Sequence, residues 1–215
     1  MDSGQEILKK LTEKLVKGDT DSVIMLTKKA IDQYVAVDEI LNKGLLIGMD
    51  IVGQKFKKNE FFIPEVLIAA RAMKAGMEMI KPLLAVAKIQ AKGKIILCTV
   101  KGDLHDIGKN ILSMMLEGAG YDVIDLGTDV AKELILEQIR VNEPDVLGMS
   151  ALLTTTMIYM REVIDALKNA NLRHQIKVII GGAPVTHDYM IEIHADAYAS
   201  DAVSGVDQVN RLLAE

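Results

Sequence analysis

The chain has 215 residues, of which 50% are hydrophobic and 4% aromatic, with no tryptophan. That length suits one large or two small domains, whose cores must be built from aliphatic side chains and methionine. The formal net charge is −5, and residues 1–90 hold 14 basic and 12 acidic side chains, while residues 91–215 hold 11 and 18. Neither half has the basic excess typical of nucleic-acid binding, so that class is disfavoured.

The single cysteine, Cys98, excludes a disulfide framework and indicates a reducing compartment. It lies inside an apolar run and is interpreted as a small core side chain rather than a nucleophile. The amino-terminal segment is polar and charged, unlike a signal peptide. No apolar run approaches the ~18 residues of a membrane span, so we expect a soluble, cytoplasmic protein.

Residues 1–88 are predicted to form a domain of helices only. Apolar residues at helical spacing predict one helix ending at Gly18, one after the cap residues 19–22, one from Val37 to about Phe56, and one from Pro64 through Met79. Lys81-Pro82 is expected to end this last helix, and residues 85–93 are expected to form a linker. Four helices with short connections are typical of an antiparallel bundle.

Residues 89–215 are predicted to form an α/β domain. Apolar runs predict strands at 95–100, 121–126, 145–150, 176–181 and 196–199, and periodic segments predict helices at about 107–118, 130–141, 156–169, 187–194 and 202–213. Strict alternation of five strands with five helices indicates a Rossmann-like, flavodoxin-like doubly wound parallel sheet.

Polar and small residues follow three of the predicted strands. The first strand leads into Asp103-Leu104-His105, the third ends at Ser150 before a Thr154–Thr156 cluster, and the fourth ends in Gly181-Gly182. Flavodoxin topology brings the loops after these strands around one cleft. An imidazole beside a carboxylate is typical of a metal-ligating histidine, and paired glycines let a bulky group approach the backbone.

Each of these features also has a purely structural interpretation. Ser150 and the threonine cluster suit helix caps, and Gly181-Gly182 suits a tight turn. Phe61-Phe62 before Pro64 suits a hydrophobic staple and a core contact, or an aromatic lid over an apolar cofactor face.

Three motifs in order nevertheless carry a resemblance to a known family. Asp103-x-His105-x-x-Gly108, Ser150-x-Leu152 and Gly181-Gly182 resemble the signature of cobalamin-binding domains in which a protein histidine ligates cobalt. The preceding helical segment with Phe62-Ile63-Pro64 is similar to the helical cap of methionine synthase and of the small methyltransferase corrinoid proteins. These proteins are stand-alone methyl carriers of methylamine, methanol and methoxyl metabolism in methanogenesis or acetogenesis. The resemblance covers essentially the whole chain.

The resemblance implies a cofactor and a set of residues that hold it. Cobalamin or a related corrinoid, with methylcobalamin as its methylated form, would bind base-off with His105 as the lower cobalt ligand. Asp103 would accept the other imidazole N–H, and Thr156 would extend this relay. The remaining implied cofactor-binding residues are Ser150 and Thr154 for the nucleotide slot, Gly108, Gly181 and Gly182 for the space around it, Asp106, Ile107 and Leu152 beside them, and Phe62 over the methyl face. No residue is expected to act as a catalytic acid or base on a substrate.

The resemblance further implies a corrinoid subunit that is not itself catalytic. It would take a methyl group from a substrate-specific methyltransferase and give it to a second methyltransferase acting on a thiol or tetrahydrofolate. A reductive activation protein would be a further partner, and the helical cap would move about the linker at 85–93. The alternatives are a cobalamin-binding sensory or regulatory module, an adenosylcobalamin mutase subunit, and a flavodoxin-like interaction domain without cofactor.

One stretch departs from the family pattern. The family often has Gly-Ala-Asp-Gly-Tyr near the fifth strand, where this chain has His194-Ala195-Asp196-Ala197-Tyr198. His194 is expected to have a surface or loop role rather than to be a second cobalt ligand.

Overall fold

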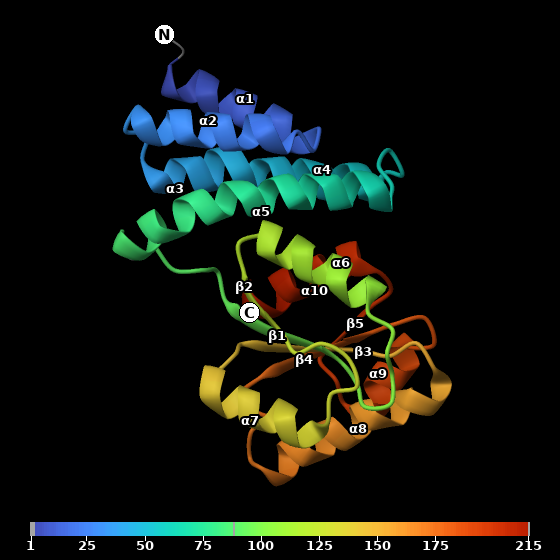
Figure 1. Cartoon of the computed structure of the whole chain (residues 1–215). Helices are drawn as coiled ribbons and strands as arrows, with labels where there is room; N and C mark the ends of the chain where they lie inside the picture. The colour runs from blue at the N-terminus through green and yellow to red at the C-terminus, as the bar shows by residue number, and fades with distance from the viewer. Residues whose placement is uncertain (1–2, 88, 215) are drawn as a thin grey trace. The chain divides into compact units, whose positions relative to one another are not determined.

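The computed structural model describes residues 3–87 and 89–214 of the chain. They divide into two compact units, one reaching Ala91 and the other starting at Lys92, with the segment Glu117–Gly120 grouped with the first (Figure 1). The first unit is helical and contains α1 (Gly4–Val16), α2 (Thr20–Asp32), α3 (Val37–Glu39), the π-helix η1 (Ile40–Leu46), α4 (Ile47–Lys57) and α5 (Ile63–Val86). The predicted bundle is thus confirmed.

Helix starts and buried faces in this unit follow from the sequence. The Ser3 and Asp19 side chains accept hydrogen bonds from the backbone N–H groups of Glu6 and Ser22, which caps α1 and α2. Apart from Thr27, the fully buried side chains of the bundle are aliphatic or methionine, as the composition requires; the largest are Ile7, Leu11, Leu15, Ile40, Leu45, Met73 and Ile80.

The predicted third helix is helical throughout but not α-helical throughout. Between α3 and α4 the chain winds as the π-helix η1. The Thr12 hydroxyl of α1 donates to the Gly44 carbonyl at 2.8 Å. A side chain at Gly44 would place its Cβ 2.8 Å from a terminal methyl carbon of Leu11, so glycine lets the two helices approach this closely without moving that leucine.

The prediction that the last bundle helix ends at Lys81-Pro82 is wrong. Helix α5 runs on to Val86 with Pro82 inside it. Proline removes one backbone N–H and crowds the carbonyl four residues earlier, which normally breaks a helix. Here Ile80 and Leu84 are buried on either side of the proline, and their burial holds the last turn in place. The predicted domain boundary, residue 88, lies outside the described residues, and residues 89–93 form neither helix nor strand.

The second unit is a doubly wound parallel sheet with strand order β2-β1-β3-β4-β5. The strands are β1 (Lys94–Thr99), β2 (Asp122–Asp125), β3 (Val146–Ser150), β4 (Lys177–Gly181) and β5 (Ala197–Ala199). The helices are α6 (Ile107–Gly118), α7 (Lys132–Asn142), α8 (Thr154–Asn169), α9 (His187–Ile193) and α10 (Ala202–Ala214). Helices α6 and α10 cover one face and α7, α8 and α9 the other (Figure 1). The predicted fold class is confirmed.

The strand register determines where the site lies. Thr99 pairs with Ser150, Ser150 with Gly181, and Gly181 with Ala199. The carboxyl ends of four strands therefore finish level with one another. The loops that carry the predicted motifs leave the sheet along this edge, where open α/β sheets bind ligands.

Candidate functional site

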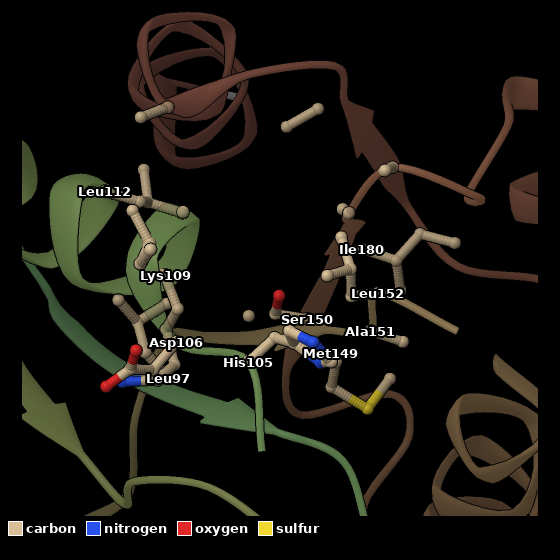
Figure 2. Close-up of a pocket in the computed structure, with 18 of the residues that line it drawn as sticks. Leu97, His105, Asp106, Lys109, Leu112, Met149, Ser150, Ala151, Leu152 and Ile180 are labelled. Carbon is tan, nitrogen blue, oxygen red and sulfur yellow. The ribbon is translucent and has the colours of Figure 1, made fainter. Parts of the chain in front are cut away.

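A cavity of about 570 Å³ opens at this edge of the sheet. It is lined by the β1–α6 loop, the start of α6, the ends of β3 and β4, and the segment from β5 into α10. Figure 2 shows Leu112 and Lys109 on one side of the opening, Leu152 and Ile180 on the other, and the Ser150 hydroxyl pointing into the space between them. Most of the wall is aliphatic or glycine, so the cavity suits a large, largely apolar ligand.

Eight of the residues predicted to bind the cofactor line this cavity: His105, Asp106, Ile107, Gly108, Ser150, Leu152, Gly181 and Gly182. Asp103 and Thr156 lie behind His105 and are buried. Thr154 is the first residue of α8, is exposed, and is not part of the lining. Phe62 belongs to the helical unit, where it precedes α5 and is 64% exposed.

Asp103 is the buried hub of the site. Its Oδ1 accepts from His105 Nδ1 at 2.8 Å and from the His105 backbone N–H at 3.1 Å. Its Oδ2 accepts from the Thr156 hydroxyl at 2.6 Å and from the backbone N–H groups of Leu152 at 2.7 Å and Leu153 at 3.3 Å. The side chain is 0% exposed. The start of α8 and the His105 loop are therefore joined through one carboxylate.

The hydrogen bonds to Asp103 keep it ionised. Burial by itself would raise the pKa of this carboxyl, but the bonds donated by Thr156, Leu152 and His105 lower it well below its usual range. An ionised carboxylate can only accept, so the His105 Nδ1 must carry a proton and donate it to Asp103. The Nε2 atom of His105 then bears the free lone pair, and the side chain is 53% exposed.

Lys109 forms a buried ion pair that the sequence analysis did not anticipate. Its Nζ lies 2.5 and 2.6 Å from the two carboxylate oxygens of Asp125, at the end of β2, and 2.8 Å from Asn110 Oδ1. Only 3% of the lysine side chain is exposed. Lys109 and Asn110 follow His105 within residues 101–110, and this closeness in sequence was the signal that could have identified them.

Two more missed residues hold the His105 loop. The buried Thr99 hydroxyl, at the end of β1, donates to the His105 carbonyl at 2.9 Å. Asp129, which follows β2, accepts from the Gly102 backbone N–H at 2.7 Å. Nothing in the sequence links residue 129 to residue 102, because the contact depends on how β1 and β2 pair.

Glycine occurs at three positions of the site for different physical reasons. Gly182 has φ +123, and a Cβ there would lie 1.8 Å from the Ala151 carbonyl oxygen, so the fold itself requires glycine. A Cβ at Gly181 would lie 3.0 Å from the Ala199 carbonyl oxygen. At Gly108, by contrast, a Cβ would meet nothing within 4 Å. Glycine at this position therefore leaves open space beside the start of α6.

His194 lies outside the cavity lining. It ends α9 with φ 62, the left-handed conformation that favours glycine, and its carbonyl accepts from Arg173 at 2.8 Å. The backbone conformation at His194 thus suits the glycine that the family pattern leads us to expect at this position.

Free metal ions have no evident site in the part of the chain that the structure describes. There, no three His, Cys, Asp or Glu side chains are grouped so that they could hold a metal ion. Among the same residues, no helix is both long and apolar enough to cross a membrane.

Comparison with known proteins matches each of the two units to a B12 binding domain family. The B12 binding domain family matches residues 93–207, and a second B12 binding domain family matches residues 7–81. A corrinoid protein of Desulfitobacterium hafniense is 41% identical over 210 residues, which cover 96% of this chain and 97% of that protein. Dimethylamine corrinoid protein 1 of Methanosarcina acetivorans is 41% identical over 213 residues, covering 99% of this chain and 100% of that one.

A solved structure agrees with these relatives. The methanol:cobalamin methyltransferase complex of Methanosarcina barkeri contains a chain that superposes with a TM-score of 0.90 at 30% identity. The superposition covers 97% of this chain and 80% of the other. The likeness therefore extends over both units.

Proposed function

The chain belongs to the corrinoid proteins of methyltransferase systems, and we propose that it carries a methyl group from a substrate-specific methyltransferase to a second methyltransferase, which acts on a thiol or tetrahydrofolate. The observation that carries this proposal is the His105–Asp103–Thr156 chain beside a deep apolar cavity. It occurs in a protein that matches corrinoid proteins over nearly its whole length.

The residues of the site fit a base-off corrinoid. A cobalt ion already held by a macrocycle needs only one protein ligand below the ring, and His105 offers one free nitrogen at a half-exposed position. The displaced nucleotide needs a slot in the protein. The open space beside Gly108 and the aliphatic wall that continues from it suit such a slot. When bound, the corrinoid supplies the metal centre that takes up and releases the methyl group.

The side chains then have distinct roles. His105 Nε2 would ligate the metal, while Asp103 holds the Nδ1 proton in place, which fixes the tautomer and would raise the basicity of the ligand nitrogen. Thr156 and the backbone of Leu152 keep the Asp103 carboxylate oriented and ionised. The Ser150 hydroxyl points into the cavity, and Asp106, Ile107, Gly108, Gly181 and Gly182 line the space that the nucleotide would occupy.

The roles of the helical unit remain part of the proposal. In this proposal the exposed Phe62 would cover the methyl face of the ring, and the helical unit would move between encounters with partners. Thr154 is retained as a weaker candidate, because it lies outside the cavity lining. A reductive activation protein restores the carrier after oxidation.

The partner methyltransferase determines the methyl donor, since relatives with similar sequence identity to this chain are named after different methylamines. The test is to reduce the cobalamin-loaded protein chemically to the Co(I) state and then incubate it anaerobically with isotopically labelled methylamines or methanol and the matching methyltransferase. We expect about one methyl group per chain with the cognate pair, and loss of that label when a thiol acceptor and its methyltransferase are added. Absence of label with every pair, despite bound cobalamin, would contradict the carrier function and favour a sensory module.

A further inference from the structure

We propose that Asp129 is a positioning residue for the cobalt ligand, although it lies on a different loop from His105 and outside the cavity lining. This inference rests on the proposed ligation by His105. Asp129 is exposed and follows β2, in the segment that leads into α7. It acts through the backbone of the loop that carries the histidine.

Two hydrogen bonds join Asp129 to that loop. Its carboxylate Oδ1 accepts from the Gly102 backbone N–H at 2.7 Å. Its own backbone N–H donates to the Asp103 carbonyl at 2.9 Å. The two bonds fix the peptide group before Gly102 and the peptide group after Asp103. The short segment between them therefore has little freedom to rotate.

That segment contains the conformations on which the histidine depends. Gly102 has φ +79, a left-handed conformation that glycine adopts without strain. The next residue, Asp103, aims its carboxylate at His105 Nδ1. A rotation at Gly102 would therefore turn the Asp103 side chain away from both His105 and Thr156.

Asp129 is itself held firmly. The segment around it extends the pairing of β1 and β2: Thr99 N–H donates to the Gly127 carbonyl at 2.9 Å, and Val130 N–H donates to the Thr99 carbonyl at 3.1 Å. Asp129 has φ 54, and aspartate and asparagine are the residues other than glycine that best tolerate this conformation. Aspartate and asparagine thus combine tolerance of the left-handed conformation with a short side chain that can accept a hydrogen bond.

Two substitutions separate the side-chain bond from the backbone conformation. Asp129→Asn keeps an acceptor oxygen and the left-handed backbone. Asp129→Gly keeps the backbone conformation and removes the acceptor. Because neither changes the cavity lining, a difference between the two variants reports the hydrogen bond to Gly102.

The first measurement needs no cofactor. Hydrogen exchange of the apoprotein, followed by NMR, should show the Gly102 amide exchanging roughly five- to ten-fold faster in Asp129→Gly than in wild type, as expected for loss of one hydrogen bond of ordinary strength at an exposed position. Asp129→Asn should exchange close to the wild-type rate. Equal exchange rates in wild type and Asp129→Gly would overturn the proposal.

The second measurement reads the ligand directly. Electron paramagnetic resonance of the protein loaded with Co(II) cobalamin should give nitrogen hyperfine splitting from His105 in wild type and Asp129→Asn. In Asp129→Gly the ratio of histidine-off to histidine-on cobalt should rise roughly five-fold, in line with one weakened hydrogen-bonding contact.

The outcomes keep the two claims apart. If wild type shows the splitting and Asp129→Gly keeps the full wild-type amplitude, the role of Asp129 is refuted and His105 ligation stands. Asp129→Asn behaving like Asp129→Gly would also refute it, because the acceptor would then not matter. If wild type lacks the splitting, or protein with 15N-labelled histidine shows the same splitting pattern as unlabelled protein, ligation by His105 fails and the role of Asp129 fails with it.

Discussion

Replacing Thr156 with valine tests the buried carboxylate hub in the absence of cofactor. Valine keeps the shape of the threonine side chain and removes only the hydroxyl that donates to Asp103 Oδ2 at 2.6 Å. Asp103 keeps the backbone donors Leu152 and Leu153 on the same oxygen, so its charge is not left without partners. We expect the free energy of unfolding to fall by about 2 kcal/mol, the usual contribution of a buried hydrogen bond to a charged group.

Urea unfolding of the apoprotein followed by tyrosine fluorescence measures this loss. The chain has five tyrosines and no tryptophan. Four of the tyrosines lie in the sheet unit, and Tyr34 in the helical unit is already 95% exposed, so the signal reports the unit that contains Thr156. Thr156→Ser is the matched control, because it keeps the donor and loses only a methyl group, and its midpoint should lie closer to wild type.

The effect of Thr156→Val should depend on pH. Burial opposes ionisation of Asp103, but Thr156 leads the hydrogen bonds that hold its pKa well below the usual range. Stabilisation by a carboxyl with a lowered pKa is complete above the unfolded-state value of about 3.9 and is lost as the pH falls through the folded-state value. The difference between wild type and Thr156→Val should be constant from about pH 6 to 8 and shrink below about pH 4. A urea midpoint for Thr156→Val equal to that of wild type at pH 7 would refute this reasoning. A difference in unfolding free energy between the two proteins that persists unchanged in acid would also refute it.

Three further predictions concern the surroundings of the site. Asp125→Asn should lower the free energy of unfolding by about 3 kcal/mol, because it leaves the buried Lys109 ammonium without a carboxylate partner. Lys109→Met should lower it clearly less, because Asp125 keeps contact with water. Equal urea midpoints for the two variants would contradict this prediction. Gly108→Leu should abolish cobalamin binding in a spectroscopic titration while the apoprotein stays folded, and Gly182→Ala should instead destabilise the fold, since its Cβ would clash with a backbone carbonyl. Burial raises the pKa of the Cys98 thiol to about 12, so iodoacetamide at pH 8 should leave it unmodified by mass spectrometry in the native protein and alkylate it in urea; rapid native labelling would contradict its burial.

Local pattern was sufficient to predict the sheet unit. A buried parallel strand appears in the sequence as an apolar run, and the run around Cys98 matches β1 to within one residue. Strand ends in such a sheet converge on one edge, so Ser150 and Gly181 could be placed beside the His105 loop before their register was known.

Tertiary context accounts for what the sequence did not predict. Pro82 normally ends a helix, but burial of its neighbours outweighs that preference. The partners of Asp129 and Lys109 lie about 16 to 27 residues away and depend on strand pairing, which local spacing does not encode. Thr154 and Thr156 look alike in sequence, and the helical turn of α8 decides that only Thr156 faces Asp103.

The visible spectrum of the cobalamin-loaded protein tests the central claim most directly. We expect wild type to bind cobalamin with its own lower base displaced and with the absorption of a histidine-ligated cobalt. His105→Gly should show a changed spectrum, and added imidazole should restore it by filling the space left by the side chain. An identical spectrum in wild type and His105→Gly, with no response to imidazole, would contradict the assignment of His105 as the cobalt ligand.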